Sequence, residues 1–123
     1  MADAQVITAG KHSPGLGRVA GNTDTTSGVT DTVTTRSDAY LQPFAAAVQA
    51  GMPMLMTSSA YYSRIDPQQP AAFSSTVIDG MVRGDLGFRG VVVSDDLANA
   101  RQVAAWAPGD RAVLFLRAGG TSC

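Results

Sequence analysis

Two adjacent aspartates, Asp95 and Asp96, are the residues whose type and position most clearly suggest chemistry. They follow a short apolar run at 91–93 that begins after Gly90. Such a run is typical of a strand buried in a parallel sheet, and α/β proteins bind ligands at the carboxyl ends of such strands. A carboxylate placed there could act as a nucleophile, as in retaining glycosidases. It could instead cap a helix beginning near Ala98, and the two roles could be divided between the two aspartates.

A lysine–histidine pair and two loop aspartates are the next candidates. Lys11 and His12 follow a short apolar run at 6–9, so they could bind sugar hydroxyls or hold a nearby carboxylate ionised. Asp24 and Asp31 lie in a long stretch rich in Gly, Thr and Asp, from which either could reach over a pocket. Plainer explanations stay open: a solvated strand end for the pair, and turns within a folded or disordered loop for the aspartates.

Strands and helices alternate along the chain and would position these residues. The expected ranges are 6–9, 53–57 and 91–93 for strands, and 38–51, 74–87, 98–106 and 108–119 for helices. The side chains expected on the apolar helix faces are Leu41, Phe44, Ala45, Val48, Val77, Ile78, Met81, Val82, Val113, Phe115 and Leu116. This order predicts an α/β fold with a parallel sheet, whose strands end in polar groups at one common edge.

Composition excludes several classes of function. The net charge is −1, from 9 basic and 10 acidic residues, so no basic stripe for nucleic acid is expected. No apolar run approaches the ~20 residues of a membrane helix. One His and one Cys, Cys123, make a His/Cys zinc site and an intrachain disulfide unexpected, and we expect no metal and no cofactor. No signal peptide is evident in residues 1–10, and the compartment is left open.

Four motifs occur in order along the chain. They are 11–17 (KHSPGLG), 22–24 (NTD), 66–67 (DP) and 83–97 (RGDLGFRGVVVSDDL). Together they resemble the N-terminal domain of glycoside hydrolase family 3, and most closely its β-N-acetylhexosaminidase branch. The resemblance runs from about residue 6 to residue 120. It implies an α/β fold, a partial (β/α)₈ TIM barrel, with about three parallel strands and intervening helices.

The resemblance also implies a role for each candidate residue. The family's catalytic nucleophile falls on Asp95, with a retaining mechanism, and its sugar-binding Lys-His pair falls on Lys11 and His12. The hexosaminidase branch carries an Asp-x-His dyad on a mobile loop, with the His as acid/base. Here Asp24 is present and Thr26 stands in place of that His. Because threonine has no useful pKa for general acid catalysis, Asp24 is the candidate acid/base or its orienter.

Length limits what this stretch of chain would do by itself. A complete barrel of this type needs ~250 residues, so we expect residues 1–123 to be a fragment of one catalytic barrel domain and to be inactive alone. The expected function is hydrolysis of terminal β-linked N-acetylglucosamine from peptidoglycan fragments or chitooligosaccharides. The alternatives are a β-glucosidase of the same family and a non-catalytic, truncated sugar-binding fragment.

Overall fold

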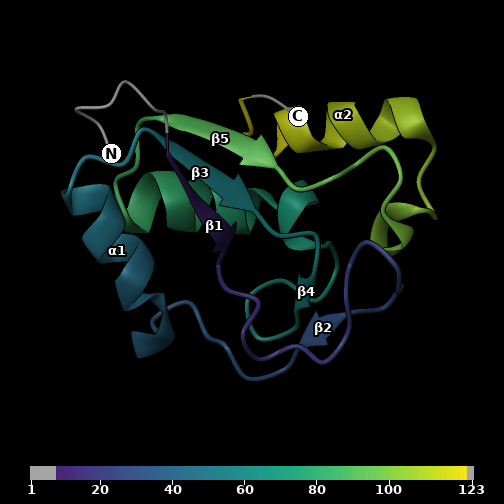
Figure 1. The fold of residues 1–123 in the computed structure, drawn as a ribbon, viewed down its shortest axis with the longest axis horizontal. Helices are drawn as coiled ribbons and strands as arrows, with labels where there is room; N and C mark the ends of the chain where they lie inside the picture. The colour runs from purple at the N-terminus through teal and green to yellow at the C-terminus, as the bar shows by residue number, and fades with distance from the viewer. Residues whose placement is uncertain (1–7, 122–123) are drawn as a thin grey trace.

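A sheet of three parallel strands lies at the centre of the structure, a computed structural model that describes residues 8–121 (Figure 1). Its strands, in spatial order, are β1 (Ala9–Ser13), β3 (Met54–Thr57) and β5 (Val91–Ser94). The predicted parallel sheet and its second and third strands are confirmed. The first strand starts later than predicted and contains Lys11 and His12, whereas Val6 and Ile7 lie outside the described residues.

Helices separate the three strands of this sheet along the chain and follow the last of them, as the alternating pattern predicted. They are η2 (Ala39–Leu41), α1 (Gln42–Gln49), η3 (Ala71–Phe73), η4 (Thr76–Asp85), η5 (Arg101–Val103) and α2 (Pro108–Arg117). Asp38 caps the first helical segment, because its side chain accepts the Tyr40 N–H at 2.8 Å. The Ser74 hydroxyl accepts the Val77 N–H at 3.1 Å at the start of η4. Helix η4 is wound more widely than an α-helix, with the Leu86 N–H bonded to the Met81 carbonyl five residues back.

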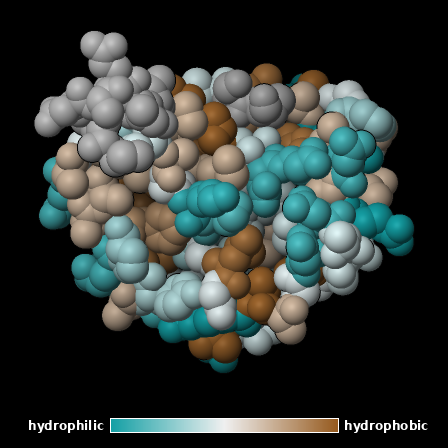
Figure 2. Space-filling model, viewed as in Figure 1, coloured by the Kyte–Doolittle hydropathy of each residue, from teal (hydrophilic) through white to brown (hydrophobic). Residues whose placement is uncertain are grey.

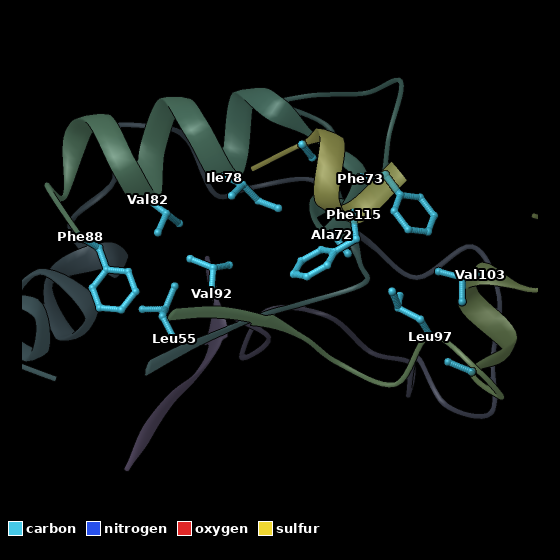
Figure 3. Close-up of a cluster of buried hydrophobic side chains, with 12 residues drawn as sticks. Leu55, Ala72, Phe73, Ile78, Val82, Phe88, Val92, Leu97, Val103 and Phe115 are labelled. Carbon is cyan, nitrogen blue, oxygen red and sulfur yellow. The ribbon is translucent and has the colours of Figure 1, made fainter. Parts of the chain in front are cut away.

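The main core lies between the sheet and its helices. Leu55 of β3 and Val92 of β5 are 0% exposed and point towards Ile78 and Val82 of η4 (Figure 3). The register pairs these two strand residues directly, so their apolar side chains lie side by side on the face of the sheet that the helices cover. Each such side chain contributes about 1.5–3 kcal/mol by burial. Packing in this layer therefore fixes the positions of β3 and β5 relative to each other, and with them the positions of the residues at their C-terminal ends.

The opposite face of the sheet is open. Met54 and Met56 of β3, with Val91 and Val93 of β5, are only partly buried there. Figure 2 has the same viewing direction as Figure 1, and it shows hydrophobic surface among polar groups on this face of the molecule. Three parallel strands with helices on one face and an apolar open face match part of a (β/α)₈ barrel, in which the open face would line the interior.

The long Thr-rich stretch is a folded loop. It contains β2 (Thr30–Asp31), which pairs in parallel with β4 (Tyr61–Tyr62). The Tyr62 hydroxyl, deep in a second apolar cluster, donates to the Gly15 carbonyl at 2.7 Å. Burial raises the pKa of this hydroxyl well above its ordinary value, so it stays a donor. The loop is thereby held against the chain that follows β3.

The helix predicted at 98–106 is wrong, since that segment contains only the short 3₁₀ turn η5. Its backbone groups are bonded elsewhere. Asp96 accepts the N–H groups of Ala98 and Asn99, and buried Arg111 of α2 donates to the carbonyls of Leu97 and Ala98 at 2.8 and 2.9 Å. In an α-helix the carbonyls of Leu97 and Ala98 would accept the N–H groups four residues on, at 101 and 102, but those N–H groups donate to the carbonyls of the loop at 23–24.

Helix α2 begins at Pro108 as predicted but buries fewer apolar residues than expected. Phe115 is 0% exposed within the main core. Val113 and Leu116 are 45% and 49% exposed, so their predicted burial is wrong for this structure. Across residues 8–121, the helices are all too short or too polar to traverse a lipid bilayer.

Candidate active site

Asp95 is the first residue beyond β5. Its N–H donates to the Thr57 carbonyl at 3.1 Å, which extends the β3–β5 ladder by one step and aims the side chain past the sheet edge. Its carboxylate is 20% exposed, and Oδ2 lies 3.7 Å from Nε2 of His12 on β1. That distance exceeds a normal hydrogen bond but is close enough for direct attraction to a protonated imidazole. Two strands that flank β3 therefore place an imidazole and a carboxylate together.

Asp96 has a different environment from its neighbour. Its side chain is exposed, and its Oδ1 accepts the N–H groups of Ala98 at 2.9 Å and Asn99 at 3.2 Å. These bonds form the side-chain cap of the turn that follows the strand. Capping, one of the two roles considered for the pair, is thus performed by Asp96, which leaves the Asp95 carboxylate directed to the cavity.

One cavity of about 460 Å³ joins the predicted candidates. Its lining residues are Lys11, His12, Leu16, Val19, Gly21, Asn22, Thr23, Asp24 and Asp95. Lys11 and His12 come from β1, Asp24 from the long loop and Asp95 from the end of β5. The fold therefore brings together residues separated by more than 80 positions in the sequence, at the sheet edge where they were expected.

Asp24 sits on a tight turn at the rim of this cavity. Asn22 forms the turn: its side chain accepts the Asp24 N–H at 2.8 Å and its carbonyl accepts the Thr26 N–H at 2.8 Å. The Asp24 side chain is exposed. Thr26, which stands where the resemblance places a histidine, borders a separate hollow lined by residues of 20–30. Asp24 and Thr26 occupy the two positions of the dyad that the resemblance implies, and of these two residues Asp24 lines the cavity.

Asp31, the other loop aspartate, does not belong to the site. It is 0% exposed, and it accepts the N–H groups of Val33 and Thr34 and the Thr34 hydroxyl at 2.6–2.8 Å. Burial alone raises the pKa of this carboxyl, but those hydrogen bonds and the positive charge of Arg18 outweigh it and lower the pKa below the usual value. Asp31 therefore stabilises the loop as an anion, which is the turn-forming role left open above.

Two residues near the site were missed from the sequence. Asn22 builds the turn under Asp24, and Gln102, 3% exposed, bonds to the loop from the far end of the chain. An Asn two residues before an Asp is a recognisable turn signal. Gln102 has no local signal, because its side-chain partner, Val29, lies 73 positions away.

The chemistry available to the cavity follows from its polar groups. Two carboxylates can divide the roles of nucleophile and proton donor at an acetal carbon. A lysine ammonium and an imidazole can donate hydrogen bonds to hydroxyl groups of a bound ligand. Within the described residues, His, Cys, Asp and Glu do not gather in a group of three that could hold a metal ion.

The chain is similar to known proteins in both sequence and fold. Residues 1–121 match the family model described as "Glycosyl hydrolase family 3 N terminal domain". A β-N-acetylhexosaminidase from Beutenbergia cavernae is 57% identical and superposes with a TM-score of 0.89, over 91% of this chain and 33% of that one. NagZ from Neisseria gonorrhoeae, solved with N-trifluoroacetyl-D-glucosamine, is 32% identical, with a TM-score of 0.77 over 91% of this chain and 32% of its own.

Curated relatives give the same result. A protein named "Beta-hexosaminidase" from Stenotrophomonas maltophilia is 36% identical over 110 residues, which are 89% of this chain and 32% of the relative. Another of that name, from Nitrosomonas eutropha, is 34% identical over 75% of this chain and 26% of its own length. The chain spans about a quarter to a third of these relatives. The structural matches confirm the predicted TIM-barrel fold class for the part that is present.

Proposed function

The chain belongs to glycosyl hydrolase family 3, and we propose that its protein hydrolyses terminal β-linked N-acetylglucosamine with retention of configuration. In this proposal residues 1–123 form part of a single catalytic barrel domain. Peptidoglycan fragments and chitooligosaccharides are the proposed substrate classes. The names of the relatives support this sugar over glucose, as does the N-trifluoroacetyl-D-glucosamine complex of one of them.

The observation that carries the proposal is the common cavity of Lys11, His12, Asp24 and Asp95. A retaining glycosidase needs one carboxylate on each side of the anomeric carbon, about 5 Å apart when the site is productive. Asp95 projects from a rigid strand end and Asp24 from a loop turn, so the two reach the cavity from different elements. This arrangement suits a sugar ring held between a fixed nucleophile and an adjustable proton donor.

In the proposed first step, a carboxylate oxygen of Asp95 attacks the anomeric carbon and forms a glycosyl-enzyme ester. Asp24 gives a proton to the departing glycosidic oxygen, so the aglycone leaves as a neutral alcohol. In the second step Asp24 takes a proton from water, whose oxygen attacks the same carbon and releases Asp95. Two inversions give net retention.

Lys11 and His12 have supporting roles in this proposal. Lys11 is exposed to the cavity and donates hydrogen bonds to sugar hydroxyls. His12, at 3.7 Å from Asp95, orients the nucleophile and lies close enough to contact the same sugar.

Substrate comparison in the complete gene product tests the proposal. We expect release of the aryl group from an aryl N-acetyl-β-glucosaminide at a rate at least about a hundredfold above that from the matching glucoside. The reverse preference would replace the proposal with the β-glucosidase alternative. Sugar binding by calorimetry with no turnover of either substrate would favour the non-catalytic alternative.

A further inference from the structure

Gln102 connects the loop that holds Asp24 to the segment that follows Asp95. Its side-chain oxygen accepts the Val29 N–H at 2.9 Å, and its side-chain nitrogen donates to the Val29 carbonyl at 2.8 Å. Gln102 is 3% exposed and Val29 is 5% exposed, so both bonds are shielded from water. A side-chain amide that pairs with both backbone groups of one residue fixes that residue in two directions.

The backbone around Gln102 holds the other end of the same loop. The Gln102 N–H donates to the Thr23 carbonyl and the Arg101 N–H to the Asp24 carbonyl, both at 3.1 Å. Both ends of the loop segment 23–29 are thus hydrogen-bonded to Arg101 and Gln102. In Figure 1 the purple loop approaches the yellow-green segment of η5 at this place.

The segment that carries Gln102 is itself fixed to the end of β5. The Asp96 side chain caps the turn at Ala98, and Arg111 of α2 binds the carbonyls of Leu97 and Ala98. Hydrogen bonds therefore hold this short segment at both of its ends. One end is fixed at the strand that bears Asp95, and the other end is bonded to the loop that bears Asp24.

We propose that Gln102 is a positioning residue that sets the distance between Asp24 and Asp95 across the sugar site. The inference rests on the proposed function for its catalytic consequence. Gln102 does not line the cavity, so it acts through the loop and not on the substrate. Because displacing a catalytic group by about 1 Å can cost up to about a hundredfold in rate, loss of these bonds slows proton transfer while sugar binding is preserved.

The test compares Gln102→Glu with Gln49→Glu in the complete gene product. Both changes add the same charge, but Gln49 is exposed at the end of α1, away from the site. A glutamate at 102 keeps the acceptor for the Val29 N–H and replaces the donor to the Val29 carbonyl by a charged oxygen. Hydrogen exchange of residues 23–29, and kcat and KM on two aryl N-acetylglucosaminides, are measured for both variants and the wild type.

At pH 8 we expect Gln102→Glu to exchange faster in residues 23–29 and to lose about 10–100-fold in kcat with a poor leaving group. KM changes little. With an activated leaving group, which departs without proton assistance, the loss is much smaller. Gln49→Glu matches the wild type throughout.

Acidification supplies an internal rescue. A protonated glutamate donates to the Val29 carbonyl as the amide does, and burial raises the pKa of such a carboxyl. The deficit of Gln102→Glu relative to wild type therefore shrinks as the pH falls from about 8 to 5. Gln102→Met, of similar size but with neither hydrogen bond, shows the deficit at every pH. A variant that merely unfolds would show faster exchange throughout the chain, with no selective rescue.

Two results would overturn the inference. One is unchanged exchange of residues 23–29 in both Gln102 variants, which would mean that the bonds do not hold the loop. The other is faster exchange with wild-type kcat on the poor leaving group, which would mean that the loop's position does not matter to proton transfer. If the wild type turns over neither sugar, the proposed function and the catalytic part of the inference fail, whereas the exchange data still decide whether Gln102 holds the loop.

Discussion

Asp95 and Asp96 are identical neighbours, yet the structure gives each a different set of partners. The Asp96 carboxylate accepts two backbone N–H groups of the next turn, and the side chain is exposed to solvent. Asp95 keeps its Oδ2 directed to His12 and to the cavity that it shares with Asp24. At the residue scale, a strand end followed by a capped turn is what separates a candidate nucleophile from a structural carboxylate.

Changing Asp24→Asn tests the proposed proton transfer. The amide keeps the size and turn preference of the aspartate but has no proton to give at neutral pH. We expect kcat to fall about 10²–10⁴-fold with a poor leaving group and far less with an activated aryl leaving group, as measured by steady-state kinetics. Thr26→Ala is the control on the same turn, and we expect near wild-type rates because Thr26 borders a different hollow. Equal losses with both leaving groups would assign the acid/base to another residue.

Individual candidate residues were predicted from the sequence more successfully than the bonds that hold them in place. Lys11, His12, Asp24 and Asp95 follow or precede recognisable strand and turn signals, and they line one cavity. Gln102 could not be predicted, because nothing in its local sequence indicates a partner 73 positions away. Long-range side-chain bonds to backbone depend on the finished fold.

At the scale of elements, the loop between β1 and α1 is held by buried polar groups. Asp31 accepts three hydrogen bonds from Val33 and Thr34 while fully buried, and Gln102 binds Val29. Such groups specify one arrangement, since any other would leave them without partners in a dry environment. The loop can therefore lack long strands or helices and still hold Asp24 at the cavity.

We expect Asp31→Asn to lower the free energy of unfolding by about 1–3 kcal/mol at pH 7, measured by urea unfolding. The pKa of Asp31 is lowered in the folded protein, so its stabilisation is full above the unfolded pKa of about 3.9 and is lost as the pH falls through the folded value. The difference between wild type and variant should then shrink below about pH 4. Asp79→Asn, at an exposed site on η4, serves as the control. A pH-independent difference would contradict the role of the charge.

The helix predicted at 98–106 is absent, and the reason is that long-range hydrogen bonds override the local preference of this segment. Its sequence has no strong breaker, so local preference alone allowed a helix. Arg111 binds the carbonyls of Leu97 and Ala98, and the loop carbonyls at 23–24 accept the N–H groups at 101 and 102, so these groups do not pair with one another as a helix requires. Strands β3 and β5 were easier to predict, because short β-branched or apolar runs flanked by Pro and Gly are typical of strands in a parallel sheet.

At the scale of the whole molecule, the described part is an open piece of a layered α/β structure. Strands β1 and β5 each have β3 as their one neighbour in the sheet. Hollows of about 520 and 360 Å³ adjoin the cavity that holds Asp24 and Asp95 and share lining residues with it; Tyr40 lines the first hollow and Pro108 the second. The relatives are about three to four times longer than this chain, so most of their length lies outside the matched region.

A polypeptide of these 123 residues alone should therefore show no turnover and should self-associate, because its open sheet and helix faces are apolar. We expect the double variant Val113→Lys, Leu116→Gln to lower the self-associated fraction in sedimentation, with stability within about 0.5 kcal/mol. These two side chains are 45% and 49% exposed on α2. Phe115→Ala is the contrasting change and should lower the free energy of unfolding by about 3–5 kcal/mol, since Phe115 is fully buried.

Sustained turnover by the isolated polypeptide would contradict the expectation that residues 1–123 are inactive alone.

The most direct test of the account is the pair Asp95→Asn and Asp96→Asn in the complete gene product. Asn at 96 still accepts the two turn N–H groups, so we expect kcat within about threefold of wild type. Asn at 95 has no nucleophilic carboxylate, so we expect a loss of at least about 10⁴-fold and no glycosyl-enzyme mass after reaction with a fluorinated N-acetylglucosaminide. Turnover and a trapped glycosyl-enzyme that persist in Asp95→Asn and vanish in Asp96→Asn would contradict the assignment of the nucleophile.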